Sequence, residues 1–462
     1  MEAIEALFLD ELEKPTEIVR QCDACLDNVF FKKDRAVNEH QYYSSMGLNR
    51  LKIDDNKFVV FTTTSLAIVN QQALNFLEKF SVKNLIENNS RSVQKFIQYG
   101  FLKPYGENKE VYKEKIDKLT TWIHITDSCN LRCHYCFLPH DPTFLSIDVA
   151  KKIVDALVKT AKENGLKKIK LKYAGGEPLQ NFKVLQELHH YALSFSDEIE
   201  FTTSILTNGT LLTIDKLQWI KEHNIRLIIS LDNIYLKNPQ RIFKDGTDSS
   251  LAVIKKIALA KKQGVTPFIS ITINNQTIDN LSSLLTWILE EKLPFSINFY
   301  KGLKSIDEAK LIQEMLKAFK IIEGNLPQHS LLNALLDMTN FADPHLRGCS
   351  VGQNYLIFDT KGNISQCPMT MNQPITSIKE NNILQKIQSP LNPLKNFSVD
   401  TKEDCKTCKW KYWCGGGCAV VNQHKEGKSP YCEVYKALFP EVLRLESIRL
   451  EKYLKKPKEE NS

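Results

Sequence analysis

The sequence predicts an α/β protein built around a parallel barrel, with a small domain before the barrel and a cysteine-rich domain after it. Three observations support this organisation. Segments typical of strands and of helices alternate between Leu119 and about Tyr300, as they do in parallel α/β barrels. Short strand-like segments precede this region, between Tyr42 and Pro104. Seven cysteines follow it, from Cys349 onward.

The composition is typical of a soluble globular protein with two or three domains. The chain has 462 residues, of which 42% are hydrophobic and 25% charged, and this is ordinary for such proteins. It has no apolar run long enough to span a membrane, and its N-terminus is acidic where a secretory signal is basic. We therefore expect a cytoplasmic protein with no membrane partner. The formal charge of +7 is spread along the chain, so we expect no nucleic-acid partner either.

Twelve cysteines in a protein of this kind indicate metal sites rather than disulfides. Cys22 and Cys25 form a lone CxxC pair within residues 1–41, which we expect to be a helical extension. Two thiols make half a metal site, and the segment has no second pair. We interpret them as ordinary, partly buried cysteines, with a redox role as the alternative.

Residues 42–112 are predicted to form a small domain of short strands followed by helices. The segments NRLKIDD and KFVVFTT read as strands joined by a hairpin turn at Asp54–Asn56. A second helix, in SVQKFIQYGFLKP, is expected to end at Gly100. The first helix, in LAIVNQQALNFLEKF, has an apolar face made of Leu74, Phe76, Leu77 and Phe80.

The barrel region contains six expected strands and five helices between them. Helix caps support this assignment, with Ser146 and Thr213 at helix starts and Gly165 and Gly264 after helix ends. The strands are expected at Trp122–Thr126, Ile169–Tyr173, Glu200–Leu206, Arg226–Leu231, Pro267–Ile273 and Phe295–Phe299. The helices are expected at Ile147–Lys162, Phe182–Ser194, Thr213–His223, Ser249–Gln263 and Leu281–Glu291.

The loop after the first barrel strand has a CxxxCxxC pattern, formed by Cys129, Cys133 and Cys136. Thiolates at this spacing can hold one soft metal centre, such as an iron–sulfur cluster. The next cysteine is Cys349, so a four-iron cluster here would keep one iron open for a substrate or cofactor. A zinc knuckle is the alternative, although structural zinc sites usually pair two short arms. The histidines that could complete such a zinc site are His124, His134 and His140.

The same loop, with aromatic Tyr135 before the last cysteine, resembles the signature of the radical SAM superfamily. The resemblance implies a [4Fe–4S] cluster on the three cysteines and S-adenosylmethionine (SAM) bound to its open iron. One electron then cleaves SAM to a 5′-deoxyadenosyl radical, which abstracts a hydrogen atom from the substrate. It also implies that residues 113–310 form an open, partial (β/α)6 TIM barrel.

Polar motifs at the ends of later strands fit this resemblance, since active sites of such barrels lie there. Glycines let a backbone approach a ligand, and a carboxylate accepts hydrogen bonds from an ammonium group. Gly175, Gly176 and Glu177 resemble the superfamily motif that binds the SAM amine. The segments TNGT, with Asn208, and SLD, with Ser230 and Asp232, resemble motifs that face the cofactor ribose and the substrate.

Three further residues near these motifs carry open alternatives. Asn233 stands where the SLDG motif has glycine. Arg241 is a candidate partner for the SAM carboxylate, and a surface arginine is the alternative. Asp232 is a weak candidate for a catalytic base, and a structural hydrogen-bond acceptor is the alternative.

Residues 345–440 hold the second cysteine group, in which a hairpin turned at Lys361–Asn363 precedes a CxxCxxxxxCxxxC run. Two structural zinc ions fit the count of seven thiols about as well as two clusters do. The complete spacing, however, resembles the SPASM domain of radical SAM enzymes. The seven residues are Cys349, Cys367, Cys405, Cys408, Cys414, Cys418 and Cys432.

The SPASM resemblance implies two auxiliary [4Fe–4S] clusters, and so three clusters in the chain. One would use Cys349, Cys367 and Cys418, and the other the remaining four cysteines. Some relatives have an eighth cysteine soon after the first, but 350–357 contain none. The first auxiliary cluster would then have an open iron, a ligand such as Asp359, or a substrate thiolate.

The remaining segments complete the expected domain organisation. Residues 42–112 resemble the PqqD-like winged-helix domain of peptide-modifying radical SAM enzymes, in which a leader peptide adds a strand to an open sheet edge. A structural cap on the barrel, or a generic winged helix, is the alternative. We expect a helical linker at 311–344, and a helix with a charged tail at 441–462.

Three functions are compatible with these features. The leading hypothesis is a radical SAM maturase that forms a thioether, carbon–carbon or carbon–oxygen link in a ribosomally made precursor peptide, with a flavodoxin or ferredoxin as reductant. The second is an anaerobic sulfatase-type maturase that oxidises one Cys or Ser. The third is an iron–sulfur electron carrier or regulator, which would not need a barrel with a GGEP motif.

Overall fold

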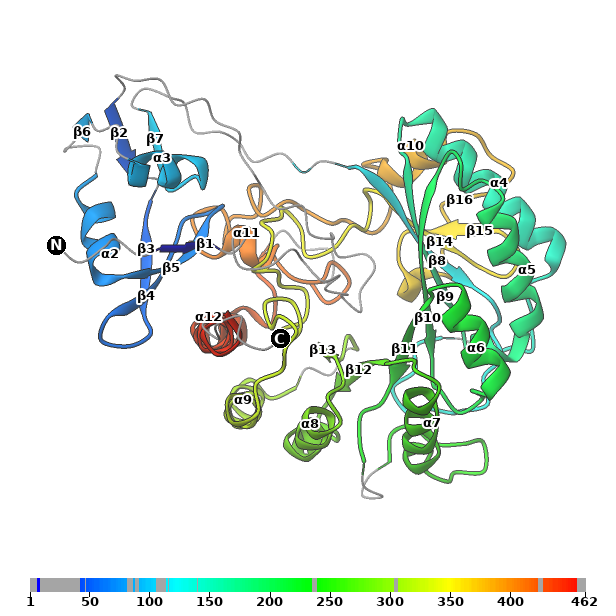
Figure 1. Ribbon diagram of the computed structural model, residues 1–462. Coiled ribbons are helices and arrows are strands. Elements are labelled where there is room, and N and C mark those ends of the chain that lie inside the picture. The colour runs from blue at the N-terminus through cyan, green and yellow to red at the C-terminus, as the bar shows by residue number, and fades with distance from the viewer. Residues whose placement is uncertain are drawn as a thin grey trace, which may run out of the picture.

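The structure is a computed structural model that describes most of the chain (Figure 1). The N-terminal extension is described only at one short strand, so Cys22 and Cys25 lie outside the described residues. The described residues are 6–8, 42–45, 47–80, 86–87, 91–104, 114, 116–138, 140–234, 239–302, 306–422 and 427–454.

A nine-stranded sheet forms the centre of the molecule, in the order β13-β12-β11-β10-β9-β8-β14-β15-β16. Its six barrel strands run parallel to one another. In the described part of the chain the order ends at β13 and β16, so the sheet is open, as predicted. The barrel strands are β8 (Lys118–His124), β9 (Lys168–Ala174), β10 (Glu200–Thr207), β11 (Arg226–Ser230), β12 (Phe268–Ile273) and β13 (Phe295–Phe299).

A helix follows each barrel strand and covers the outer face of the sheet (Figure 1). The predicted helix starts are confirmed, because Ser146 and Thr213 cap α4 and α6 by accepting backbone hydrogen bonds. Gly165 and Gly264 follow helix ends with positive φ, as expected. The helices are α4 (Ile147–Glu163), α5 (Phe182–Leu193), α6 (Ile214–Glu222), α7 (Ser250–Lys262), α8 (Leu281–Glu290) and α9 (Glu308–Gly324).

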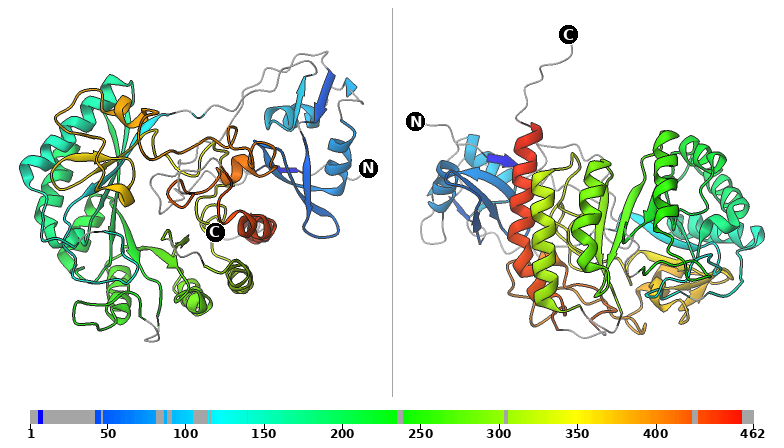
Figure 2. Two further views of the ribbon diagram at one scale, coloured as in Figure 1. Left: turned by 180° about the vertical axis from the view of Figure 1, so that it is seen from behind. Right: turned by 90° about the horizontal axis from the view of Figure 1, so that it is seen from below.

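Helix α9 corrects the expected helical linker. It completes the sixth strand–helix unit, and residues 325–344 contain no helix. Helix α12 (Cys432–Leu454) lies beside α9, and α8 packs on the other side of α9 (Figure 2). The C-terminal helix thus starts nine residues earlier than predicted, at the last cysteine. A buried pair, Arg449 and Glu446, anchors α12, since Glu446 also accepts hydrogen bonds from Ser330 and Leu331.

The predicted cysteine-region hairpin is confirmed, but its position in the fold was not expected. Strands β14 (Tyr355–Phe358) and β15 (Asn363–Ser365) pair antiparallel, followed by β16 (Thr376–Ser377). Strand β14 also pairs in parallel with β8, with Ile357 opposite Trp122. The hairpin therefore continues the barrel sheet from the strand that precedes the Cys129 loop.

The N-terminal region contains two small antiparallel sheets. One has the order β1-β5-β4-β3 and the other β6-β2-β7. The predicted hairpin is confirmed, because β3 pairs with β4. The strands are β1 (Ala6–Phe8), β2 (Tyr42–Ser45), β3 (Asn49–Lys52), β4 (Lys57–Phe61), β5 (Leu66–Asn70), β6 (Ile86–Glu87) and β7 (Leu102–Pro104), and the helices are α2 (Gln71–Glu78) and α3 (Arg91–Gln98).

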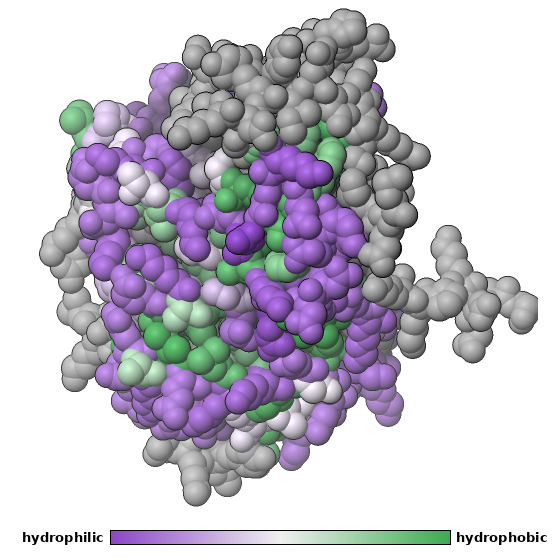
Figure 3. Space-filling model, turned by 90° about the vertical axis from the view of Figure 1, so that its left-hand side faces the viewer, coloured by the Kyte–Doolittle hydropathy of each residue, from purple (hydrophilic) through white to green (hydrophobic). Residues whose placement is uncertain are grey.

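Two expectations for this region are wrong. Residues 6–8, expected to be helical, form strand β1, which pairs antiparallel with β5. The segment LAIVN, expected to begin a helix, is β5 itself, and its β-branched residues fit a strand better than a helix. From the side of this domain, hydrophobic patches interrupt a mostly hydrophilic surface (Figure 3).

The N-terminal sheet packs against the second cysteine region. Phe61 of β4 stacks on Trp410, with ring centroids 4.4 Å apart, and the indole of Trp413 donates a hydrogen bond to the Thr62 carbonyl. These contacts join the sheet to the segment between Cys408 and Cys414. None of the described helices is long and apolar enough to cross a membrane.

Candidate functional site

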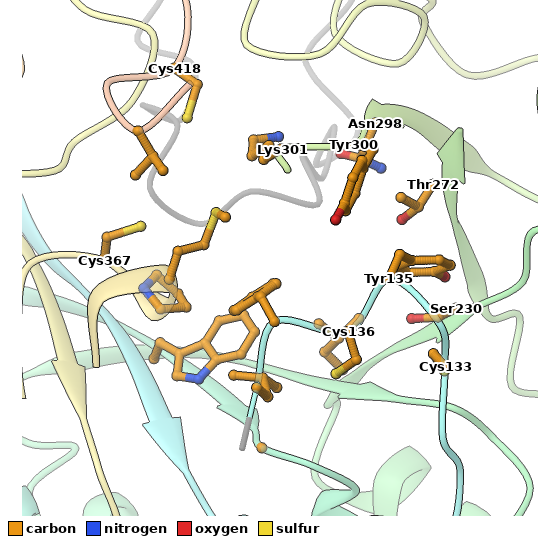
Figure 4. Close-up of a pocket in the computed structure, with 18 of the residues that line it drawn as sticks. Cys133, Tyr135, Cys136, Ser230, Thr272, Asn298, Tyr300, Lys301, Cys367 and Cys418 are labelled. Atoms are coloured by element: carbon orange, nitrogen blue, oxygen red, sulfur yellow. The ribbon is translucent and has the colours of Figure 1, made fainter. Parts of the chain in front are cut away.

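A cavity of about 320 Å³ lies between the barrel strands and the C-terminal cysteine region. Six cysteines line it. Cys133 and Cys136 lie across the cavity from Cys367 and Cys418 (Figure 4). The two groups are far apart in the sequence, and the fold brings them to one space. The first group is Cys129, Cys133 and Cys136, and the second is Cys349, Cys367 and Cys418.

Gly175 and Gly176 line the cavity and hold the start of the cysteine loop. The N–H of Gly176 donates to the Thr126 carbonyl, at 2.7 Å. A Cβ on Gly175 would lie 2.5 Å from that carbonyl oxygen, and one on Gly176 would lie 2.3 Å from the Ser128 oxygen. The two glycines are therefore needed for backbone packing against the loop as well as for access to a ligand.

Glu177 is fully buried and does not line the cavity. Its carboxylate accepts hydrogen bonds from the Thr207 hydroxyl (2.6 Å), the Asn208 N–H (2.8 Å) and the Leu179 N–H (3.0 Å). Burial raises the pKa of Glu177, and these hydrogen bonds oppose the rise. In this arrangement the carboxylate joins the ends of β9 and β10. Its predicted contact with the SAM amine stays a prediction.

Asn208, at the end of β10, lines the cavity and contacts the cysteine loop. Its side-chain amide donates to Asn130 Oδ1, at 2.9 Å, and lies 3.9 Å from Cys129 Sγ. The Asn130 amide in turn donates to the Thr210 hydroxyl, at 2.8 Å. The TNGT motif thus orients the loop of the first cysteine group.

Tyr135, Arg241 and Asp232 form one hydrogen-bonded group beside Cys133. The guanidinium of Arg241 donates to the Tyr135 hydroxyl, at 2.7 Å, and the hydroxyl donates to Asp232. Burial raises the pKa of Tyr135 well above its usual value, so the phenol keeps its proton. Burial alone would lower the pKa of Arg241, but the nearby Cys133, Tyr135 and Asp232 raise this pKa overall. Arg241 is therefore a charged group of the cavity wall rather than a surface arginine.

Asp232 is 2% exposed and does not line the cavity. Its second oxygen accepts the Thr272 N–H, at 2.7 Å. Burial raises the pKa of Asp232, and the nearby Arg241 opposes the rise. These contacts favour the structural interpretation over a catalytic base. Ser230 does line the cavity, and Asn233 has no positive φ, so the missing glycine leaves the backbone unstrained.

The structure adds cavity residues that sequence reasoning missed. Thr272 of β12 and Asn298 of β13 line the cavity, next to Tyr300 and Lys301 (Figure 4). The sequence did contain a signal for them, namely polar residues at every second position of these strands. Alternate residues of a strand share one face, so this pattern indicates a polar face towards the cavity. Lys301 pairs with the buried Asp337, at 2.6 Å.

A second missed cation lies deeper in the barrel. Lys172 is buried and lines the cavity, with its ammonium group 5.3 Å from the centre of the Trp122 ring. The two residues are side by side on β9 and β8, as the neighbouring pairs of those strands indicate. The cavity wall therefore contains three cationic side chains, Lys172, Arg241 and Lys301.

The chemistry of the first cysteine group fits a metal cluster. Burial raises the pKa of Cys129 to about 11, and it also raises that of Cys133. A buried thiol ionises readily only beside positive charge, which iron ions supply when bound. Among the described residues, no three His, Cys, Asp or Glu side chains converge as for a single metal ion. A four-iron cluster is larger than one ion, and its ligands stand further apart.

The other four cysteines do not line the cavity, but they lie close to one another. Burial raises the pKa of Cys414 to about 12, and the charges of the other three add to this rise. This proximity is compatible with the predicted grouping of one four-thiol site. The four are Cys405, Cys408, Cys414 and Cys432.

Asp359 is a poor candidate for the missing ligand of the first auxiliary cluster. Its carboxylate accepts hydrogen bonds from Lys361 and Asn363, which close the β14–β15 turn. It does not line the cavity. Tyr355, in the stretch where some relatives have an eighth cysteine, does line it.

Comparison with known proteins agrees with this site. Residues 123–288 match the Radical SAM superfamily. The chain is 23% identical to the radical SAM cyclopropyl synthase TigE of Paramaledivibacter caminithermalis, over 89% of this chain and 97% of the relative. It is 22% identical to a cysteine-type anaerobic sulfatase-maturating enzyme of Clostridium perfringens, over 68% of this chain and 93% of the relative.

A solved structure shares the fold. It is anSMEcpe with bound AdoMet, which matches with a TM-score of 0.60 and 20% identity over 72% of this chain and 99% of that chain. The part of the partial barrel that carries the CxxxCxxC loop thus matches the Radical SAM superfamily. The chain has homologues among cyclopropyl synthases and sulfatase-maturating enzymes. The superfamily match implies SAM and one [4Fe–4S] cluster.

Proposed function

We propose that this enzyme modifies a ribosomally made precursor peptide by forming a thioether, carbon–carbon or carbon–oxygen link. The observation that carries the proposal is the single cavity lined by both cysteine groups. A substrate held there would lie between the site of hydrogen abstraction and a site able to accept an electron. Forming a link by loss of two hydrogen atoms requires both a site of hydrogen abstraction and a site that accepts an electron.

The two ends of the cavity differ in chemistry, which supports separate sites for cofactor and substrate. Asn208, Ser230 and Arg241 make one end polar, near the first cysteine group. Met338, Val351 and Leu394 make the other end mostly apolar, near the second group, and Lys301 is the charged residue beside Cys418 there. The polar end suits SAM, which supplies a hydrogen-abstracting radical when bound. The apolar end suits the side chain that is to be modified.

The proposal includes three [4Fe–4S] clusters on the ten cysteines named above, and a flavodoxin or ferredoxin as reductant. It also includes a leader peptide bound by the N-terminal region, whose antiparallel sheet has a described edge at β3. The structure of anSMEcpe with AdoMet and the Cp18Cys peptide offers related support, because a peptide binds to a protein of the same fold.

The test uses the reconstituted enzyme with SAM, dithionite and the peptide of a neighbouring short open reading frame. We expect 5′-deoxyadenosine and a peptide that loses two hydrogens per link, measured by mass spectrometry. Formation of 5′-deoxyadenosine without any change in the peptide would reject that substrate. An electron carrier, the non-enzyme alternative, would form no 5′-deoxyadenosine.

A sulfatase-type maturase is the second candidate, favoured by the fold shared with anSMEcpe. Its product is an aldehyde on one Cys or Ser residue, which reacts with hydrazine reagents. A link between two residues does not. Treating the product peptide with a hydrazine reagent therefore separates the two functions.

A further inference from the structure

Lys402 is a buried lysine in the second cysteine region, and no motif predicted it. Lys402 is only 3% exposed. The ammonium group donates a hydrogen bond to the Gly416 carbonyl, at 3.0 Å. That glycine lies between Cys414 and Cys418 in the sequence. These cysteines belong to the two different groups of the region.

Lys402 lies near cysteines of both groups of the C-terminal region, the four that do not line the cavity and the three that do. Its own carbonyl accepts the Cys405 N–H, at 3.0 Å. Burial lowers the pKa of the ammonium group, and the charges of Cys405, Cys414, Cys349 and Cys418 oppose this fall. Two of these thiols belong to the four-cysteine group and two to the group that lines the cavity. The lysine is therefore positioned between the two groups.

The backbone leaves space for this ammonium group. A Cβ on Gly416 would lie 2.8 Å from Lys402 Nζ, closer than real Cβ atoms come to other atoms. The Gly416 carbonyl also accepts the Asn422 side-chain amide, at 2.9 Å, which fixes its direction. A backbone carbonyl alone does not compensate a buried charge. Thiolate-ligated iron–sulfur clusters, which are negatively charged, do.

We propose that Lys402 lies between the two auxiliary clusters and raises the reduction potential of both. The inference rests on the proposed function in one respect, since it requires those clusters to be present. Each cluster becomes more negative on reduction, and a fixed positive charge nearby stabilises that state. Net charge and hydrogen bonding at the sulfur ligands are known determinants of cluster potential. Lys402 thus acts on the reduction potentials of the clusters and is not a catalytic residue.

The experiment is a redox titration of the reconstituted full chain, followed by electron paramagnetic resonance without peptide. Lys402→Met removes the charge and keeps the length of the side chain, whereas Lys402→Arg keeps the charge. The matched control is Lys406→Met, because Lys406 is exposed and next to Cys405. The SAM-binding cluster serves as an internal reference, recognised by the change of its signal when SAM is added.

We expect both auxiliary potentials to become more negative in Lys402→Met and to stay near wild type in Lys402→Arg and Lys406→Met. Unchanged potentials in Lys402→Met at full iron content would overturn the proposal. If that variant loses iron, Lys402→Gln decides the question, because its neutral amide can still donate a hydrogen bond to the Gly416 carbonyl and should lower the same potentials at full iron content. Iron and sulfide content reports separately whether the auxiliary clusters exist, and peptide mass reports separately on the proposed function.

Discussion

The hydroxyl of Tyr135 accepts a hydrogen bond from Arg241, at 2.7 Å, and donates one to Asp232. The guanidinium of Arg241 is also 3.6 Å from the Asp232 carboxylate. The aromatic residue of the cysteine loop therefore fixes the direction of a cation in the cavity wall. Tyr135 and Arg241 are 106 residues apart in the sequence, and the fold brings them into contact.

Replacement of Tyr135 by Phe should weaken SAM binding by about tenfold, because a hydrogen bond to a charged group contributes roughly 1.5–3 kcal/mol. Isothermal titration calorimetry with the reconstituted enzyme measures this change. Tyr300→Phe is the matched control, since Tyr300 also lines the cavity but has no such contact with Arg241 among the described interactions. Equal loss of affinity in both variants would argue against a specific role for the Tyr135 hydroxyl.

Glu177→Gln should destabilise the fold, although it removes a buried carboxylate. The carboxylate accepts three hydrogen bonds, two of them from the backbone N–H groups of Leu179, after β9, and Asn208, after β10. A glutamine NH₂ group would face one of those donors, and an unsatisfied buried group costs about 1–3 kcal/mol. Thermal unfolding should show a lower Tm than wild type. A Tm equal to that of wild type would show that Glu177 does not hold the strand ends together.

The sequence predicted the barrel well because its signals are local. Apolar strand segments, capping residues and glycines after helix ends lie within a few residues of the elements they define. The predicted core of each barrel strand is confirmed, and boundaries differ by a few residues. The strand-end motifs were also placed correctly, because the carboxyl ends of parallel strands meet at one side of a sheet.

What the sequence did not predict depends on contacts between distant residues. The parallel pairing of β14 with β8 joins segments far apart in the chain, and no local pattern specifies it. The hydrogen bonds of Glu177 come from β10, so its structural role was hidden. Lys402 was missed because it is one of several lysines around these cysteines, which look like exposed charges in the sequence, and only the fold shows that it is buried.

Two histidines, the buried His189 and the half-buried His329, should make the fold less stable in mild acid. Burial lowers the pKa of His189 and of His329 to about 4. The unfolded chain binds protons at these residues below about pH 6.5 and the folded chain does not, so stability falls as pH decreases from there towards 4. Each histidine should contribute about 2 kcal/mol of this loss between pH 7 and pH 5.

Denaturant unfolding of His189→Gln, His329→Gln and the double variant, at pH 5 and pH 7, measures this effect. The double variant should show the smallest difference between the two pH values, whatever its absolute stability. A difference as large as that of wild type would mean that other groups cause the acid sensitivity.

Iron content should separate the three predicted clusters. Cys129→Ala should remove about a third of the iron and all formation of 5′-deoxyadenosine, because four-iron clusters are held by cysteine thiolates. Paired substitutions Cys349→Ala with Cys367→Ala, and Cys405→Ala with Cys408→Ala, should each remove about a third as well. Both should retain SAM cleavage in the absence of peptide. Loss of all iron in every variant would contradict independent clusters.

Asp337→Asn should uncouple SAM cleavage from peptide modification. The Asp337 carboxylate pairs with Lys301 and accepts the Phe299 N–H, so it holds a cationic residue of the cavity wall near Cys418. Without that ion pair, Lys301 loses a contact that orients it in the part of the cavity proposed for the substrate, whereas the first cysteine group keeps its contacts. We expect the ratio of 5′-deoxyadenosine to modified peptide to rise by about tenfold, since a hydrogen-bonded ion pair of this kind contributes roughly 1.5–3 kcal/mol. Lys310→Met, which removes an exposed ion pair with Asp279 on the outer face, is the control and should leave the ratio unchanged. A parallel fall in both products in Asp337→Asn would instead indicate that the substitution damages the whole site.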